Sequence, residues 1–214
     1  MLNYELPRSI AIEGPIRVGK SSLARLLAQR LRARPILDCE ENPFLDDFYQ
    51  ERPGAAFKAQ MFFLIQRFQQ LRGLAAESLR ATLVTDYLFE KDKIFASITL
   101  NDEELRLYDA YYDLLRQQVP TPDLVIYLQA TTQVLQRRIA RKNSPLETEI
   151  SPDYLEEVVK AYEHFFFHYK ASRLLVINTS EIDFVASQQD LEQLLRRLTK
   201  PVVGTQYFLP LGST

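Results

Sequence analysis

The sequence predicts an α/β fold in which helices flank a doubly wound, mostly parallel sheet of five strands. Short apolar runs alternate along the chain with longer segments of helical periodicity, which is the pattern of successive strand–helix–strand units. The clearest strand, residues 123–128, is apolar almost throughout, as expected where both faces of a parallel sheet are covered. A glycine-rich loop follows the first strand directly, which is typical of folds that bind phosphate at a helix N-terminus.

The five expected strands are short, and turn or helix signals follow each of them. They are residues 10–12, 35–38, 82–85, 123–128 and 174–177. Between them, apolar residues recur on one helix face, as Leu23, Leu27 and Leu31 do in the first helix. The expected helices are residues 21–34, 55–79, 103–119, 132–141, 154–169 and 190–198. Because helical crossovers make strands parallel, the carboxyl ends of the strands gather at one edge of the sheet.

Length and composition indicate one globular domain, residues 1–200, followed by a C-terminal tail, residues 201–214, that is not strongly polar. The net charge of −2 is a poor match for a protein that binds nucleic acid. No apolar run reaches the length of about 18 residues that would cross a membrane. The single cysteine, Cys39, cannot form an internal disulfide, and the N-terminus has no apolar signal core. We therefore expect a cytoplasmic protein.

The glycine-rich loop has the spacing of a phosphate-binding P-loop. The segment GPIRVGKS satisfies G-x-x-x-x-G-K-[ST] between a strand and a helix. Glycine lets successive backbone N–H groups turn toward phosphate oxygens, and the following helix adds its positive end. Lys20 is expected to reach the β- and γ-phosphates and Ser21 to ligate Mg²⁺. The expected ATP-binding residues of this segment are Gly14, Pro15, Ile16, Arg17, Val18, Gly19, Lys20, Ser21 and Ser22.

Acidic residues follow the second and third strands, where a phosphotransferase needs them. Asp38, Glu40 and Glu41 come after the second strand, and Asp86 ends the third. One of the first group is expected to accept the proton of an acceptor hydroxyl, and Asp86 to hold Mg²⁺ directly or through water. Carboxylates at strand ends also act as plain helix caps, and each residue taken alone fits that alternative about equally well.

A basic cluster ends the helix expected at residues 132–141. Its members are Arg137, Arg138, Arg141 and Lys142. They either compensate the helix dipole or form a short lid that closes positive charge over the transferred phosphate. In the second interpretation, residues 143–149 are the moving part of that lid, and Arg138 acts in catalysis beside Lys20.

Five motifs together resemble the bacterial deoxynucleoside kinases of the deoxyadenosine/deoxyguanosine kinase type, across roughly residues 8–199. They are IAIEGPIRVGKSS at 10–22, EENPFLDDFY at 40–49, QMFFLIQR at 60–67, DYLFEKD at 86–92 and DLVIYL at 123–128. The resemblance implies a P-loop kinase that transfers the γ-phosphate of ATP, with Mg²⁺, to the 5′-hydroxyl of a deoxynucleoside, with a purine preferred. It also implies a homodimer formed through the long helices.

The resemblance also implies roles for individual residues. The general base of the family matches Asp38, one methylene shorter than the usual glutamate, and Glu40 is the alternative. The implied nucleoside-binding residues are Asp38, Tyr49, Gln60, Phe63, Arg67, Tyr87, Asp92, Glu147 and Tyr154, with Gln60 at the base edge and Tyr49 and Glu147 at the 3′-hydroxyl. Residues 182–184, with Asp183 and Phe184, match the segment that covers the adenine of ATP, and Arg138 and Lys142 match its phosphate contacts.

The lid departs from the family pattern of Arg-x-x-x-Arg-Gly-Arg. Asn143 replaces the glycine and Ser144 the last arginine, so a planar phosphate clamp is lost. Arg17, in the P-loop, is one candidate to replace that charge. Two alternatives stay open: a nucleoside monophosphate kinase similar to thymidylate kinases, and a weakly catalytic nucleotide-binding sensor or partner module.

Overall fold

The computed structural model describes residues 6–39, 41–78, 80–142 and 150–209. Within this part of the chain, six parallel strands form one sheet in the order β2-β3-β1-β4-β5-β6. The strands are β1 Ser9–Glu13, β2 Arg34–Ile36, β3 Leu83–Thr85, β4 Leu124–Gln129, β5 Arg173–Asn178 and β6 Thr205–Phe208. The prediction of an α/β fold with a doubly wound parallel sheet is confirmed.

Helices follow the strands on both faces of the sheet. They are α1 Lys20–Leu31, α2 Leu45–Tyr49, α3 Ala55–Leu71, α4 Leu74–Ser78, α5 Lys91–Thr99, α6 Asp102–Arg116, α7 Thr132–Lys142, α8 Pro152–His168 and α9 Gln188–Leu198. None of these described helices is long and apolar enough to cross a membrane.

The predicted count of five strands is wrong, because the expected tail contributes a sixth. β6 pairs in parallel with β5 from Leu174 opposite Thr205 to Ile177 opposite Phe208. Its residues alternate between exposed and half-buried, and Tyr207 is 72% exposed. Such an edge strand lacks the continuous apolar run by which the central strands are recognised.

The helices also differ from the prediction. The helix expected at residues 55–79 ends at Leu71, and α4 begins only after Gly73, because glycine disfavours a helix interior. The helix expected at 21–34 ends at Leu31, where Arg32 takes a left-handed conformation with φ of 51° as its C-cap. The prediction missed α5, Lys91–Thr99, which is short and begins directly after the loop from β3.

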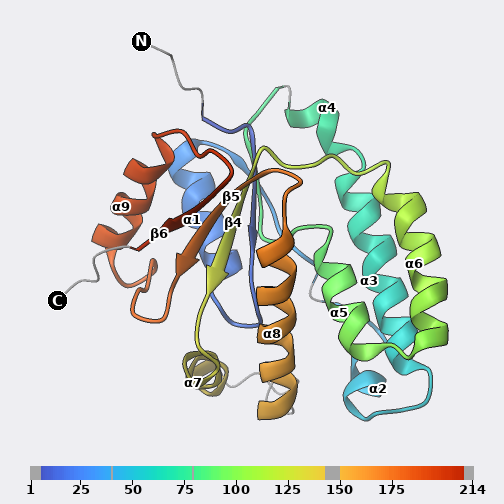
Figure 1. Ribbon diagram of the computed structural model, residues 1–214. Helices are drawn as coiled ribbons and strands as arrows, with labels where there is room; N and C mark the ends of the chain where they lie inside the picture. The colour runs from blue at the N-terminus through green and yellow to red at the C-terminus, as the bar shows by residue number, and fades with distance from the viewer. Residues whose placement is uncertain (1–5, 40, 79, 143–149, 210–214) are drawn as a thin grey trace.

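The core lies between the sheet and its two helical layers. In Figure 1, α1 and α9 lie on one side of the sheet, and α8, α5, α3 and α6 lie on the other. Alternate residues of β1 face the two layers: Ile10 and Ile12 are buried in the cluster that includes Leu23 of α1, and Ala11 between them packs in the cluster that includes Tyr162 of α8. Helices α2 and α7 lie beyond the carboxyl ends of the strands, the edge that carries the P-loop.

Candidate active site

The P-loop joins β1 to α1 and is held by close backbone packing. A Cβ on Gly14 would stand 2.4 Å from the carbonyl oxygen of Leu128 on β4, so only glycine fits there. Gly19, with φ of 109°, precedes α1 in a left-handed conformation. The Lys20 Nζ donates to the carbonyl oxygens of Gly14 at 2.7 Å and Pro15 at 2.9 Å, so its ammonium lies inside the turn. Burial, together with the nearby charge of Lys91, lowers the pKa of Lys20 to about 8.

Arg17 occupies a position in this loop that would suit glycine. Its φ is 60°, and a left-handed conformation costs a residue with a Cβ roughly 1–2 kcal/mol. Its side chain is half-buried. The loop geometry therefore imposes a strained backbone on an arginine, and such strain is concentrated at functional sites.

Asp38, two residues beyond β2, lies at the centre of a buried ionic cluster. Arg67 of α3 donates from Nε to Oδ1 at 2.8 Å and from Nη2 to Oδ2 at 2.9 Å, a bidentate pair. Lys91, the first residue of α5, donates to Oδ2 at 2.7 Å. Burial acts to raise the pKa of Asp38, but the charges of Lys91 and Arg67 outweigh it and hold that pKa well below its ordinary value. The Asp38 carboxyl group is therefore ionised at neutral pH.

The opposite side of Arg67 contacts a second carboxylate. Nη1 of Arg67 donates to Oδ1 of Asp92, which is fully buried. Burial raises the pKa of Asp92 to about 6, and its Oδ2 is buried without a hydrogen-bond partner. We call Asp38, Arg67, Lys91 and Asp92 the acceptor cluster.

Asp86, at the end of β3, links the acceptor cluster to the P-loop. It is 3% exposed, and its Oδ1 accepts the backbone N–H of Asp38 at 2.6 Å. Its charge also acts on Lys20. Ser21 lies in the first turn of α1, after the P-loop lysine. A hydroxyl and a carboxylate are the hard oxygen ligands that Mg²⁺ takes beside substrate phosphates, so these two residues fit the ion.

The residues expected around a nucleoside base lie on α3 beside this cluster. Gln60 is buried, and its Nε2 donates to the Oγ1 of Thr99 at 3.1 Å. The ring of Phe63 lies 4.5 Å from the guanidinium carbon of Arg67. Gln60, Phe63 and Arg67 lie within two turns of one helix, so the structure brings them together with Asp38 and Asp92.

Three tyrosines also belong to the predicted nucleoside-binding set, and Tyr87 contacts Arg67 directly. Tyr87 is 1% exposed, and its hydroxyl donates to Gln70. Its ring packs in the core formed with α3 and α6, behind Arg67. Tyr49 on α2 and Tyr154 on α8 are half-buried and electrostatically coupled to each other, and burial raises the pKa of Tyr154.

Arg138 of α7 is engaged with backbone carbonyls. It donates to the oxygens of Val18 in the P-loop at 3.1 Å, Thr179 at 2.7 Å and Ile182 at 3.3 Å. It therefore ties the P-loop to the segment that follows β5. Lys142 is exposed at the end of the same helix.

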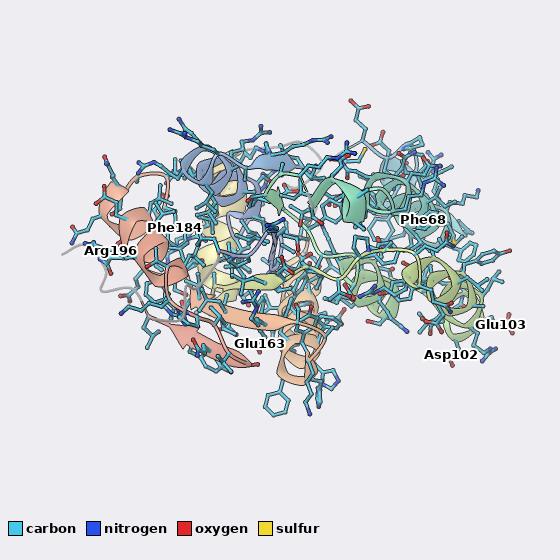
Figure 2. All side chains as sticks on the ribbon, turned by 90° about the horizontal axis from the view of Figure 1, so that it is seen from above. Phe68, Asp102, Glu103, Glu163, Phe184 and Arg196 are labelled. Atoms are coloured by element: carbon cyan, nitrogen blue, oxygen red, sulfur yellow. The ribbon has the colours of Figure 1, made fainter. Side chains whose placement is uncertain are left out.

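The segment expected to cover adenine is anchored beside Arg138. The Asp183 carboxylate accepts the backbone N–H groups of Val185 and Ala186, and the Phe184 side chain is buried in the core beside α1 and α9. Figure 2 places Phe184 on the side of the molecule that carries α9, and Phe68 of α3 on the opposite side. The expected adenine contact and the expected nucleoside contacts thus lie on opposite sides of the P-loop. The predicted residues Glu40, Glu147, Asn143 and Ser144 lie outside the described residues.

Sequence reasoning missed two charged residues of this site. Glu13, the last residue of β1, is fully buried and accepts the N–H groups of Gly14 at 2.8 Å and Leu88 at 2.7 Å. Its Oε1 also accepts the hydroxyl of Tyr162 at 3.1 Å, and burial raises its pKa. Glu13 therefore joins the P-loop, the loop after β3 and α8. The sequence signal that could have identified Glu13 is a charged residue at the end of an otherwise apolar strand.

The second missed residue is Lys91, although it lies inside the DYLFEKD motif. Sequence alone gives no reason to prefer it over Lys93, two residues later. The structure distinguishes them, because Lys93 pairs with Asp109 on α6 and is 43% exposed, while Lys91 contacts Asp38 and is 14% exposed.

A phosphate loop after β1, a paired carboxylate after β2 and a second carboxylate after β3 define a P-loop phosphotransferase. Comparison with known proteins identifies its family: residues 10–203 match the family model described as deoxynucleoside kinase. The chain belongs to the deoxynucleoside kinase family and is an enzyme of that kind.

Three relatives illustrate the similarity. The deoxyguanosine kinase of Bacillus subtilis is 33% identical over 201 residues, covering 91% of this chain and 97% of that protein. The deoxyadenosine/deoxycytidine kinase of the same organism is 24% identical, covering 96% and 99%. The solved deoxyadenosine kinase of M. mycoides, with the products dCMP and a flexible dCDP bound, superposes with a TM-score of 0.76 at 25% identity, covering 88% of this chain and 97% of that one.

Proposed function

We propose that this enzyme transfers the γ-phosphate of ATP to the 5′-hydroxyl of a purine deoxynucleoside. The observation that carries the proposal is the position of Asp38. It is a buried, ionised carboxylate held by Arg67 and Lys91 and linked through Asp86 to the P-loop side of the site. The purine preference rests on the deoxyguanosine and deoxyadenosine kinases among the relatives.

In the proposed reaction, the 5′-oxygen attacks the γ-phosphorus. A bond forms between them, the bond from that phosphorus to the bridging oxygen breaks, and ADP leaves with the electron pair. The hydroxyl proton passes to Asp38, which later releases it to water. A carboxylate of such low pKa is a weak base, so its main task is to orient the hydroxyl and to take the proton late, when the forming ester makes that proton strongly acidic.

Lys20 and the backbone N–H groups of the P-loop hold the phosphates of ATP in this proposal. Ser21 and Asp86 would hold Mg²⁺, which neutralises charge that develops on the phosphates. Gln60, Phe63, Arg67 and Asp92 contact the acceptor base, and Tyr49, Tyr87, Tyr154 and Glu147 complete the nucleoside site. Asp183 and Phe184 cover the adenine of ATP, and Arg138 and Lys142 contact its phosphates when the lid is closed.

The direct test is a panel of deoxynucleosides with Mg-ATP, read by ADP release. Deoxyguanosine or deoxyadenosine is expected to be turned over fastest, and thymidine slowest. The panel includes deoxynucleoside monophosphates as acceptors. ADP release that depends on a monophosphate and not on a nucleoside would refute the proposal in favour of a monophosphate kinase.

The ionic contacts of Arg67 argue against the monophosphate kinase. An acceptor phosphate needs arginines in its pocket, whereas the Arg67 guanidinium is already paired with the carboxylates of Asp38 and Asp92. The third possibility, a nucleotide-binding module with little catalysis, predicts tight binding of ATP with no turnover of any acceptor in the same panel.

We also propose a homodimer through the long helices. Leu107, Tyr111 and Leu114 form a stripe on one face of α6 and are 48% to 62% exposed, and Ile65 of α3 is 43% exposed. Figure 1 shows α3 and α6 side by side at the outer edge of the molecule. Leu114→Glu is expected to convert a dimer to a monomer in analytical ultracentrifugation, whereas Val203→Glu on the far side is not. If the wild-type protein is monomeric at high concentration, the proposed homodimer is refuted.

A further inference from the structure

Lys91 lies between the two halves of the proposed site. Its Nζ is 2.7 Å from Oδ2 of Asp38, and its charge acts on both Lys20 and Glu13, which belong to the P-loop side. Its side chain is 14% exposed. A cation therefore stands beside the carboxylate that faces the acceptor hydroxyl and within electrostatic range of the lysine that faces the donor phosphate.

Two arginines of the proposed site already bond several partners. The guanidinium of Arg138 bonds the carbonyl oxygens of Val18, Thr179 and Ile182. That of Arg67 bonds Asp38 and Asp92. Arg67 is a planar donor held by two buried carboxylates, so turning it toward a phosphate would leave them unpaired. Arg138 would have to release its carbonyl oxygens before it could contact a donor phosphate as the lid closes.

An ammonium group has three donors and no fixed plane. The carboxylate of Asp38 takes one of the three from Lys91. The bidentate pair with Arg67 keeps that carboxylate in place independently. Lys91 can therefore bind a second anion without releasing Asp38.

We propose that Lys91 is a catalytic residue that binds the phosphoryl group as it reaches the acceptor side. The proposal rests on the proposed function. Lys20 holds the γ-phosphate while it is bonded to ADP, and Lys91 contacts its oxygens as the bond to the 5′-oxygen forms and the bond to ADP breaks. The negative charge on those oxygens is then stabilised by Lys20 on the donor side and by Lys91 on the acceptor side. After transfer, the phosphate of the product, a deoxynucleoside 5′-monophosphate, stays in contact with Lys91.

The test compares Lys91→Met with the matched control Lys93→Met on the same helix and with the conservative Lys91→Arg. The affinities of the best deoxynucleoside of the panel and of its 5′-monophosphate are measured by calorimetry, and kcat and KM by ADP release. Thermal unfolding shows whether each variant folds.

We expect Lys91→Met to lower kcat by about 100-fold or more, the usual cost of a lost charge contact in a transition state. Affinity for the monophosphate is expected to fall about ten-fold or more, since a charge-assisted hydrogen bond is lost, while affinity for the nucleoside stays within about three-fold. Lys91→Arg recovers part of the monophosphate affinity, and Lys93→Met changes neither quantity.

Equal changes in the two affinities, or a loss of kcat with no loss of monophosphate affinity, would overturn the proposal, since Lys91 would then only position Asp38. The binding measurements do not need turnover. If the wild-type protein phosphorylates no nucleoside, the proposed function fails, while the difference between the two affinities still decides whether Lys91 binds phosphate.

Discussion

Replacing Arg67 with methionine should destabilise the protein in a way that depends on pH. Arg67 is 4% exposed and pairs with two carboxylates, Asp38 and Asp92. Removing the guanidinium leaves both carboxylates buried with less positive charge to balance their negative charges. Loss of one partner of a buried ion pair costs about 3–5 kcal/mol, so at pH 8 we expect a loss of that size in the free energy of unfolding. With a typical urea dependence, this lowers the urea midpoint by roughly 2 M.

The pH dependence follows from Asp92. Burial raises its pKa to about 6 from an ordinary value of 3.8, even though the charge of Arg67 acts in the opposite direction. A raised pKa in the folded state means stability that is present at low pH and is lost as pH rises through the folded pKa. Without Arg67 the pKa rises further, so at pH 5 Asp92 is largely neutral in both folded proteins and adds little to the difference in stability between them. The destabilisation by Arg67→Met should therefore be smaller at pH 5 than at pH 8.

The measurement is urea unfolding of wild type and variant at both pH values, with Arg72→Met as control. Arg72 lies on the exposed side of the same helix region, and its guanidinium carbon is 5.7 Å from the ring of Phe68. The control is expected to lose less than about 1 kcal/mol at either pH. If Arg67→Met were as stable as wild type at pH 8, Arg67 would not stabilise the buried carboxylates. If the loss had the same size at both pH values, Asp92 would not cause it.

The remaining predictions concern turnover. Lys20→Ala should abolish phosphate transfer while the melting temperature stays near that of wild type, and unchanged turnover would remove Lys20 from the site. Asp38→Asn should lower kcat far more than Glu40→Gln does, and the reverse order would make Glu40 the base. Arg17→Gly should relieve the strained backbone, yet lower kcat if Arg17 supplies charge that the lid lacks; an equally fast or faster variant would dismiss that role.

Most of the fold could be predicted because its signals are local. The P-loop spacing, the apolar strand at residues 123–128 and the helical periodicities each depend on neighbouring residues only. β6 was not predictable in this way, since its place in the sheet depends on pairing with β5 rather than on its own hydrophobicity. The break between α3 and α4 at Gly73 was visible in the sequence, but the apolar pattern on both sides suggested continuity.

The candidate site was predictable where a motif fixes spacing, as for Lys20, Ser21 and Asp86. The ionic contacts were not predictable, because they join residues from separate elements. Asp38 and Arg67 are 29 positions apart, and Asp38 and Lys91 are 53 apart. Only the fold brings α3 and α5 against the end of β2, and only then does Lys91 differ from Lys93.

The proposed reaction is tested by transfer of radiolabel from γ-labelled Mg-ATP to 2′-deoxyguanosine or 2′-deoxyadenosine. The control is the matching 2′,5′-dideoxynucleoside, which lacks the acceptor hydroxyl. We expect labelled 5′-monophosphate from the deoxynucleoside and no labelled product from the dideoxynucleoside. Label that appears on another position of the nucleoside, or no label on any deoxynucleoside while ATP binds tightly, would contradict the proposed reaction.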